Sequence, residues 1–170
     1  QVNFKVEKSV REPGEVILSI RDLCVPSRRH GVPVRIEALD IRAGEILGLA
    51  GVEGNGQSEL IEALTGLRRI ESGTILLSGK DITRASIRER NESGLAHIPE
   101  DRQKRGLVLD YSLEENFILK NHRDAPYSCH GFLQPDAIRQ HAIAVIQAFD
   151  VRSGEGPDSS ARAMSGGNQQ

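Results

Sequence analysis

The stretch GVEGNGQSEL, residues 51–60, decides the fold that this sequence predicts. It matches the phosphate-loop pattern G-x-x-x-x-G-K-[ST] at Gly51, Gly56 and Ser58. At the position of the lysine the chain has Gln57, whose neutral and shorter side chain brings no positive charge to the β- and γ-phosphates of a nucleotide. The stretch is therefore a nucleotide site, a weakened nucleotide site, or a glycine-rich turn without a ligand.

The residues on either side give this stretch the context of a phosphate loop. The apolar run EILGLA, residues 45–50, predicts a short strand buried on both faces. QSELIEALTGL, residues 57–67, predicts a helix with one apolar face and with Gly66 at its C-terminal cap. Because a helix N-terminus offers free N–H groups and a positive dipole end, phosphate binding here does not depend on a lysine alone. The sequence therefore favours a phosphate loop over a ligand-free turn.

The chemistry of the loop predicts a site that holds nucleotide but turns it over poorly. Its glycines permit positive φ and bring N–H groups close to an anion, and Ser58 would place its hydroxyl on Mg²⁺. Losing a hydrogen bond to a charged group costs about 1.5–3 kcal/mol, and about 1.4 kcal/mol is tenfold in affinity. Phosphoryl transfer loses more, because a neutral amide cannot replace positive charge in the transition state. The predicted nucleotide-binding residues of the loop are Gly51, Glu53, Gly54, Asn55, Gly56, Gln57, Ser58 and Glu59.

The 170-residue chain has the composition of one soluble domain, with 38% hydrophobic and 27% charged residues and a net charge of −2. The basic clusters RASIRER and RQKRG lack interleaved aromatic residues, so a solvated face is favoured and no nucleic-acid partner is predicted. Two cysteines make no disulfide framework, which fits a reducing cytosol. His122, Cys129 and His130 do not have the spacing of a structural zinc motif. No apolar run approaches the roughly 18 residues of a membrane-spanning helix.

Local patterns predict the remaining elements. EVILSIRDLCV (15–25) and VRIEALDI (34–41) alternate as strands and flank a turn-rich segment, which predicts a β-hairpin. The next expected elements are a strand in SGTILLSGKDI (72–82), a surface helix in ASIRERNES (85–93) and a brief strand in LAHIPEDR (95–102). A helix is expected over 112–122, opened by a capping box of Ser112 and Glu115. Another helix is expected from Pro135, with a buried stripe of Ile138, Ala142, Val145 and Phe149, followed by a loop over 152–163.

The last seven residues, MSGGNQQ, resemble the LSGGQ signature of ATP-binding cassette (ABC) proteins in its extended LSGGNQQ form, with Met164 in place of leucine. The resemblance implies that this motif lies at a helix N-terminus and binds the phosphates of an ATP held by the phosphate loop of an opposite cassette. The residues to which it assigns this role are Ser165, Gly166, Gly167, Asn168 and Gln169.

Two longer segments, residues 43–67 and HIPEDRQKRGLVLDYSLEENFIL (97–119), resemble the second cassette of the double-cassette ATPase subunits of ribose, galactoside and nucleoside importers. The sequence GVEGNGQSEL is most similar to that of the nucleoside importers in this group. In this family the second cassette often lacks the phosphate-loop lysine, which agrees with Gln57.

The fold that the resemblance implies is α/β: a P-loop NTPase ABC-type nucleotide-binding domain with an antiparallel β subdomain and a helical subdomain, the C-terminal part of its core missing. A linker or arm would occupy residues 1–14, and a partial nucleotide-binding domain residues 15–170. Within that domain, the β subdomain and phosphate-loop core would span 15–99, the Q-loop-like region and helical subdomain 100–163, and the signature 164–170.

Glu100 departs from a generic cassette, because it stands where the family has the glutamine that touches Mg²⁺ and the attacking water. The resemblance therefore makes Glu100 the candidate catalytic residue, and Glu100 and Ser58 the candidate Mg²⁺ ligands. The equally weighted alternative is a structural role, in which Glu100 and Asp101 form salt bridges to Arg102 and Lys104. The loop that usually supplies an aromatic residue for adenine, PSRRH (26–30), has none, so an arginine at 28 or 29 would stack instead.

The implied function is that of the ATP-binding domain of an ABC importer, with ATP and Mg²⁺ as cofactors, that couples ATP binding and hydrolysis to uptake of a sugar or nucleoside. Its expected partners are the other cassette, the transmembrane permease subunits and, indirectly, a substrate-binding protein, at the cytoplasmic face of the cell membrane. The strand ending in Asp-Glu and the switch histidine of a cassette would follow Gln170, so we expect a piece of a longer subunit that does not hydrolyse ATP alone. The alternatives are a non-transport ABC clamp in translation or DNA repair and a regulatory nucleotide-binding module.

Overall fold

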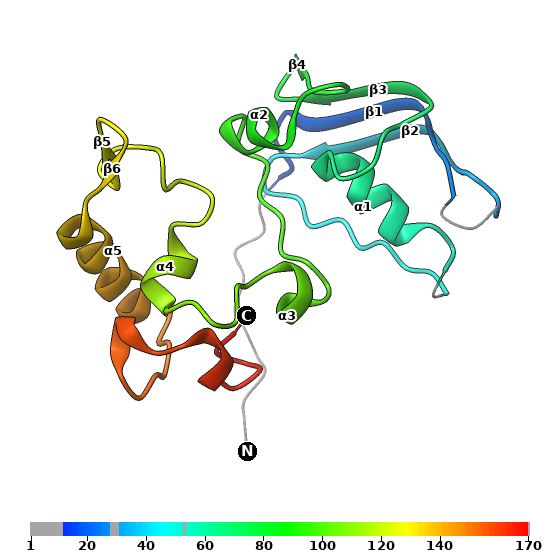
Figure 1. Ribbon diagram of the computed structural model, residues 1–170. Helices are drawn as coiled ribbons and strands as arrows, with labels where there is room; N and C mark the ends of the chain where they lie inside the picture. Colours follow the sequence, from blue (N-terminus) through cyan, green and yellow to red (C-terminus); the bar gives the residue numbers. More distant parts are fainter. Residues whose placement is uncertain (1–11, 28–30, 53, 170) are drawn as a thin grey trace. The chain divides into compact units, whose positions relative to one another are not determined.

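The computed structural model describes residues 12–27, 31–52 and 54–169 of two compact units, the first ending at His97 and the second beginning at Ile98 (Figure 1). The first unit contains β1 (Val16–Val25), β2 (Val34–Arg42), α1 (Gln57–Thr65), β3 (Ser72–Leu77), β4 (Lys80–Asp81) and α2 (Ile87–Glu92). The second contains α3 (Arg102–Arg105), α4 (Leu113–Phe117), β5 (Ser128–Cys129), β6 (Phe132–Leu133), α5 (Pro135–Ala148) and two 3₁₀ turns, η1 (Gly156–Asp158) and η2 (Ala161–Ala163). Among these elements, no helix has both the length and the apolar character to cross a membrane.

A four-stranded antiparallel sheet forms the base of the first unit, with the strand order β2-β1-β3-β4. β1 and β2 make the predicted hairpin, in which Ile20 lies opposite Leu39 and Cys24 opposite Arg35. β1 also pairs with β3, so it is hydrogen-bonded along both edges. The antiparallel sheet predicted for this part of the chain is confirmed.

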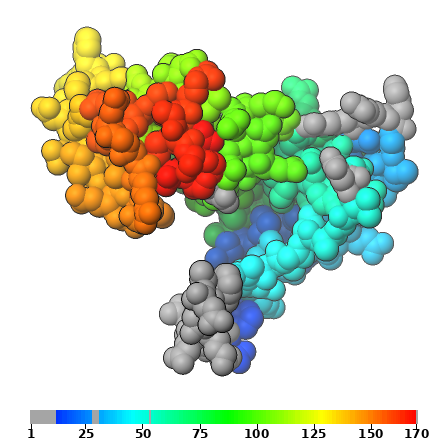
Figure 2. Space-filling model, turned by 90° about the horizontal axis from the view of Figure 1, so that it is seen from below, coloured from blue at the N-terminus to red at the C-terminus, as the bar shows by residue number. Residues whose placement is uncertain are grey.

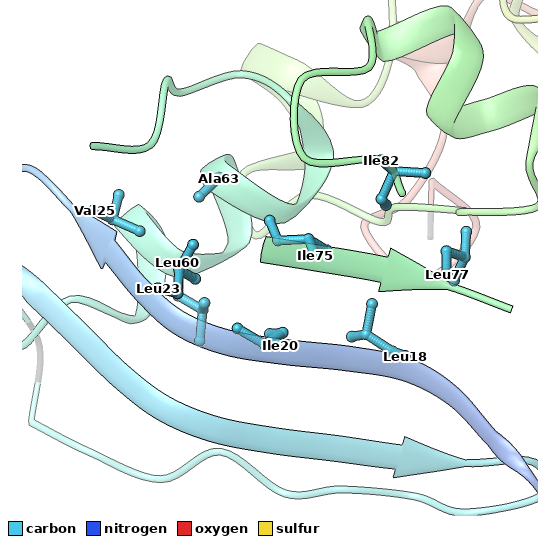
Figure 3. Packing of buried hydrophobic residues seen from close by; sticks show 9 residues of the cluster. All are labelled: Leu18, Ile20, Leu23, Val25, Leu60, Ala63, Ile75, Leu77 and Ile82. Atoms are coloured by element: carbon cyan, nitrogen blue, oxygen red, sulfur yellow. The ribbon is translucent and has the colours of Figure 1, made fainter. Parts of the chain in front are cut away.

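The core of the first unit lies between this sheet and α1 (Figure 3). β1 supplies four of its side chains, and the left-handed backbone of Asp22 (φ 49°) lies where the strand's alternation shifts by one residue. Ile20 and Leu23, three positions apart, consequently face the same side and meet Leu60 and Ala63 of α1. The cluster comprises Leu18, Ile20, Leu23, Val25, Leu60, Ala63, Ile75, Leu77 and Ile82.

A buried arginine on α2 fixes the C-terminal end of α1. Arg90 is 3% exposed, and its Nη1 donates to the carbonyl oxygens of Ala63 (3.3 Å) and Leu64 (2.8 Å). Its other nitrogens donate to the carbonyls of Thr83 and Ala85, both 3.0 Å away. Because the last carbonyls of a helix lack the usual N–H partners of the next turn, Arg90 donates to them together with the N–H of Gly66, which bonds to Ala63 at 3.2 Å, and its charge complements the negative end of the helix dipole.

The prediction of a buried strand at residues 45–50 is wrong. The segment forms no strand, and Ile46, Leu47 and Leu49 are 88%, 43% and 55% exposed. A strand requires a neighbour to satisfy its N–H and C=O groups, and no described strand pairs with this segment. The brief strand predicted at 95–102 is absent for the same reason, and Ile98 is 71% exposed.

The second unit is mainly helical and has its own small core. Leu113, Ala161 and Met164 are buried, with Leu107, Phe117, Ile146 and Val151 packed against them. The predicted capping box of Ser112 and Glu115 is present, but α4 ends at Phe117, five residues before the predicted end. α5 begins at Pro135 as predicted, with Ile138 and Ala142 buried.

The end of the predicted stripe on α5 is wrong, because Phe149 is 78% exposed. This residue is the C-cap of α5, and its φ of −106° and ψ of 8° depart from helical values. Its side chain therefore no longer follows the periodicity of the helix.

Candidate nucleotide-binding site

The phosphate-loop stretch adopts a conformation that depends on glycine. Gly54 and Gly56 have φ values of 86° and 100°, in the left-handed region. Gly56 is also buried against β2, where a Cβ would overlap the side chain of Val34. As the N-cap of α1, Gly56 has no side chain to accept a hydrogen bond, so the first N–H groups of α1 are left for an acceptor from outside the helix. This is the arrangement that suits an anion.

The side chain of Gln57 folds back onto its own loop. Its Nε2 donates to the carbonyl oxygen of Val52, 3.4 Å away, and lies where a Cβ on Gly51 would be. Asn55 closes the same turn, since its N–H donates to the Val52 carbonyl at 3.2 Å. The amide at the lysine position is thus engaged with the loop backbone.

The other predicted residues of the loop differ in what they can offer. Ser58, the second residue of α1, is exposed, so its hydroxyl is accessible to an ion. Glu59 lies in the first turn, where its carboxylate stabilises the helix dipole but repels a phosphate, which leaves its N–H as the group that could serve. Glu53 lies outside the described residues, as do Arg28 and Arg29.

A cavity of about 270 Å³ opens beside the loop within the first unit. Its volume lies just below the range of about 300–1,000 Å³ for drug-sized ligands, so it has room for part of a nucleotide. The lining combines loop backbone with apolar side chains of β2 and α1: Val34, Ile36, Leu49, Ala50, Gly51, Asn55, Gly56, Gln57 and Leu60.

The signature segment, red in Figure 2, lies on the surface of the second unit. It forms one helical turn. The N–H of Gln169 donates to the carbonyl of Ser165 at 3.0 Å, which closes the turn. Met164 is 9% exposed and anchors the turn in the core, whereas Ser165, Gly166 and Gly167 are exposed. The turn therefore presents a hydroxyl and the backbone of two glycines to the outside.

Side chains of the signature itself hold the turn in place. Nε2 of Gln169 donates to the carbonyl of Ala161 at 2.9 Å, and its Oε1 accepts from Gln103 at 3.2 Å. Asn168 is half-buried and bonds to Arg152 and Ser165. These two predicted nucleotide ligands are consequently engaged with the second unit.

Glu100 and Asp101 have separate roles. Oδ1 of Asp101 accepts from the backbone N–H of Lys104 at 3.1 Å, which caps α3, and its Oδ2 lies 3.4 Å from the Lys104 ammonium. The backbone hydrogen bond and the charge of Lys104 hold the pKa of this carboxyl below its ordinary value. The predicted salt bridge is therefore confirmed between Asp101 and Lys104. Glu100 is exposed and takes no part in the cap. The loop of residues 51–59 belongs to the first unit; Glu100 and the signature belong to the second.

The sequence did not predict the burial of two polar residues. Arg90 belongs to the basic cluster RASIRER, for which a solvated face is predicted, but it is buried. Asn116, 8% exposed, accepts from the N–H of Val108 and donates to the carbonyls of Val108, Tyr111 and Ser112, so it orders the loop before α4. Its sequence signal was a short polar side chain three positions after Leu113, on the buried face of the predicted helix. Over the described ranges, no cluster of three or more His, Cys, Asp or Glu side chains is placed to hold a metal ion.

Two curated relatives match almost the whole chain. Guanosine import ATP-binding protein NupO of Bacillus subtilis (strain 168) is 48% identical, over 100% of this chain and 33% of that protein. Nucleoside import ATP-binding protein NupA of Lactococcus lactis subsp. cremoris (strain MG1363) is 45% identical, over 99% of this chain and 33% of that protein. The chain thus spans about a third of the length of these relatives.

Structural similarity and a family profile agree with these relatives. A crystal structure of a nucleotide-free ATP-binding cassette from an ABC transporter superposes with a TM-score of 0.71 at 18% identity, over 91% of this chain and 61% of that chain, which is a likeness of fold. The sequence profile of the ABC transporter family matches residues 35–170. The chain belongs to the ABC transporter family.

Proposed function

We propose that this chain is part of the ATP-binding subunit of an importer that couples ATP binding and hydrolysis to uptake of a nucleoside or sugar. The observation that carries the proposal is the 48% identity over the whole chain to a guanosine import ATP-binding protein. The chain also contains both a phosphate-loop stretch and a signature turn, which is the pair of sites that such a subunit needs.

In this proposal, the loop around Gly56 holds the phosphates of one ATP. Glycines with left-handed φ, the uncapped start of α1 and the cavity beside it support this role. Because Gln57 is neutral and bonded to Val52, the loop binds ATP weakly and contributes little to its hydrolysis. Mg²⁺, when bound with the nucleotide, would neutralise phosphate charge. Ser58 and Glu100 are exposed oxygen donors of the type that this ion prefers, and each is proposed as a ligand on that chemistry.

The signature turn would act on a different nucleotide. Exposed Ser165, Gly166 and Gly167 offer one hydroxyl and two N–H groups to the phosphates of an ATP on the opposite cassette. Each ATP would then be bound between the phosphate loop of one cassette and the signature of the other. This chain would contribute a complete signature to one of these two sites and a weakened phosphate loop to the other. We also propose that the subunit docks on permease subunits at the cytoplasmic side of the membrane, with a substrate-binding protein supplying the solute.

The test is transport by the complete subunit that contains this segment, reconstituted with its permease in proteoliposomes. We expect ATP-dependent uptake of labelled guanosine or, in the sugar case, of ribose, and we expect Ser165→Ala to reduce it strongly. Salt-sensitive binding to RNA or DNA without uptake would favour the non-transport clamp. Nucleotide binding with neither uptake nor hydrolysis would favour the regulatory module.

A further inference from the structure

Asn168 links the signature turn to the segment after α5 through three hydrogen bonds. Its Oδ1 accepts from the backbone N–H of Arg152 at 3.2 Å. Its Nδ2 donates to the carbonyl oxygen of the same residue at 3.2 Å and to Oγ of Ser165 at 3.1 Å. The side chain is half-buried, whereas Ser165 is exposed.

The two bonds to Arg152 determine which way the amide of Asn168 points. The N–H of Arg152 can only donate and its carbonyl can only accept, so the amide oxygen must face the former and the amide nitrogen the latter. The opposite orientation would place donor against donor and acceptor against acceptor. It follows that Ser165 faces the NH₂ group of Asn168.

This orientation makes the Ser165 hydroxyl an acceptor on the side of Asn168. Since Nδ2 of Asn168 donates to it, Oγ of Ser165 is the acceptor in that bond, and its own hydrogen points elsewhere. Because Ser165 is exposed, its hydroxyl hydrogen can point into solvent, where an anionic oxygen could accept it. A carboxylate at position 168 would do the reverse, because it would accept the hydroxyl hydrogen.

We propose that Asn168 is a positioning residue that holds the Ser165 hydroxyl as a donor to a phosphate oxygen of ATP, and does not itself contact the nucleotide. The inference rests on the proposed function of the signature turn. Its physical basis is that a hydrogen bond to a charged group contributes about 1.5–3 kcal/mol, roughly tenfold or more in affinity, and that a donor held in its productive geometry by a neighbouring side chain makes this bond more effectively.

A merely structural role would give a different kinetic result, because hydrogen bonds between Asn168 and Arg152 would stabilise the turn whether or not Ser165 has a hydroxyl. A double-mutant cycle distinguishes the positioning role from this structural role. The protein is the complete subunit bound to its permease, the readouts are KM for ATP and kcat of ATP hydrolysis, and the variants are Ser165→Ala, Asn168→Ala and the double variant. The matched control is Asn121→Ala, at an exposed asparagine in a turn of the same unit.

We expect each single variant to lower kcat/KM by about tenfold, and the double variant to be no worse than Ser165→Ala. Asn168→Asp keeps an acceptor for the Arg152 N–H, but it has no donor for the Arg152 carbonyl and reverses the bond to Ser165, so it should be at least as impaired as Asn168→Ala. Losses that multiply in the double variant, or an Asn168→Asp subunit that is fully active, would overturn the inference. An Asn168→Ala subunit that does not fold leaves the Asn168→Asp arm decisive.

Failure of the proposed function gives a different result. If Ser165→Ala alone leaves kcat/KM unchanged, the Ser165 hydroxyl does not act on ATP, so the role proposed for that hydroxyl in the signature turn fails together with the positioning role of Asn168. If Ser165→Ala is impaired while Asn168→Asp is not, only the positioning role fails.

Discussion

The side-chain amide of Gln57 donates to the backbone carbonyl of Val52, 3.4 Å away, inside the loop whose pattern calls for a lysine. The group that should reach outwards to phosphate is thus turned inwards, next to Gly51. This relationship suggests that position 57 limits the affinity of the loop for nucleotide.

Restoring the lysine should strengthen the site. Gln57→Lys replaces a neutral amide with an ammonium, so titration calorimetry of Mg-ATP should give a Kd about tenfold lower or better. Gln57→Leu, which removes the bond to Val52 without adding charge, is the control and should not bring the same gain. An unchanged Kd for Gln57→Lys would mean that something other than position 57 limits binding.

The glycines of the loop should differ in their tolerance of a methyl group. Gly56→Ala combines a left-handed φ with overlap against Val34, so it should lower the free energy of unfolding by about 2 kcal/mol or more. Gly54→Ala has the same kind of φ but open space, and should cost about 1 kcal/mol. Gly48→Ala meets nothing within 4 Å and has no positive φ, so it is the matched control. Urea denaturation of the three variants tests this order.

The Arg90 side chain should contribute to stability through the carbonyls that it satisfies. Arg90→Met fills similar space but leaves the carbonyl of Leu64 without this donor, whereas that of Ala63 keeps the N–H of Gly66 at 3.2 Å. The cost should be about 1–3 kcal/mol for a carbonyl that water cannot reach. Arg90→Lys should recover only part of this, since one ammonium cannot reach four carbonyls. Equal stability of the wild-type chain and Arg90→Met in urea denaturation would contradict the role.

The pair of Arg139 and Asp158 should make the stability of the second unit fall in acid. The hydrogen bond from Arg139, at 2.7 Å, holds the pKa of Asp158 below its ordinary value of 3.8. A carboxyl with a lowered folded-state pKa stabilises the fold above its unfolded pKa, and this contribution is lost as the pH falls through the folded value. The difference in Tm between wild type and Asp158→Asn should therefore be present at pH 6 and vanish on acidification below the folded pKa. A difference that is the same at every pH would exclude this pair as its source.

Features that depend on neighbouring residues were predictable from the sequence. The hairpin of β1 and β2, the capping box of Ser112 and the glycine at the end of α1 each follow from a few adjacent side chains. The glycine geometry of the phosphate loop belongs to the same class.

Features that depend on residues distant in the sequence were not predictable from it. The apolar run at 45–50 has the composition of a buried strand, yet a strand exists only when another chain segment pairs with it, and composition does not report that segment. Burial of Arg90 likewise depends on carbonyls that lie 26 and 27 positions away in the sequence. The inward turn of Gln57 could not be foreseen, because the pattern specifies residue types and not rotamers.

The burial of Met164 and the exposure of the three residues after it affect which substitutions each position tolerates. Met164 lies in the core, while Ser165, Gly166 and Gly167 face outwards. Position 164 therefore selects only for apolar volume, and methionine and leucine are nearly equivalent there. The next three positions are exposed, so packing does not constrain them, and a substitution of Met164 by leucine would leave the surface that they form unchanged.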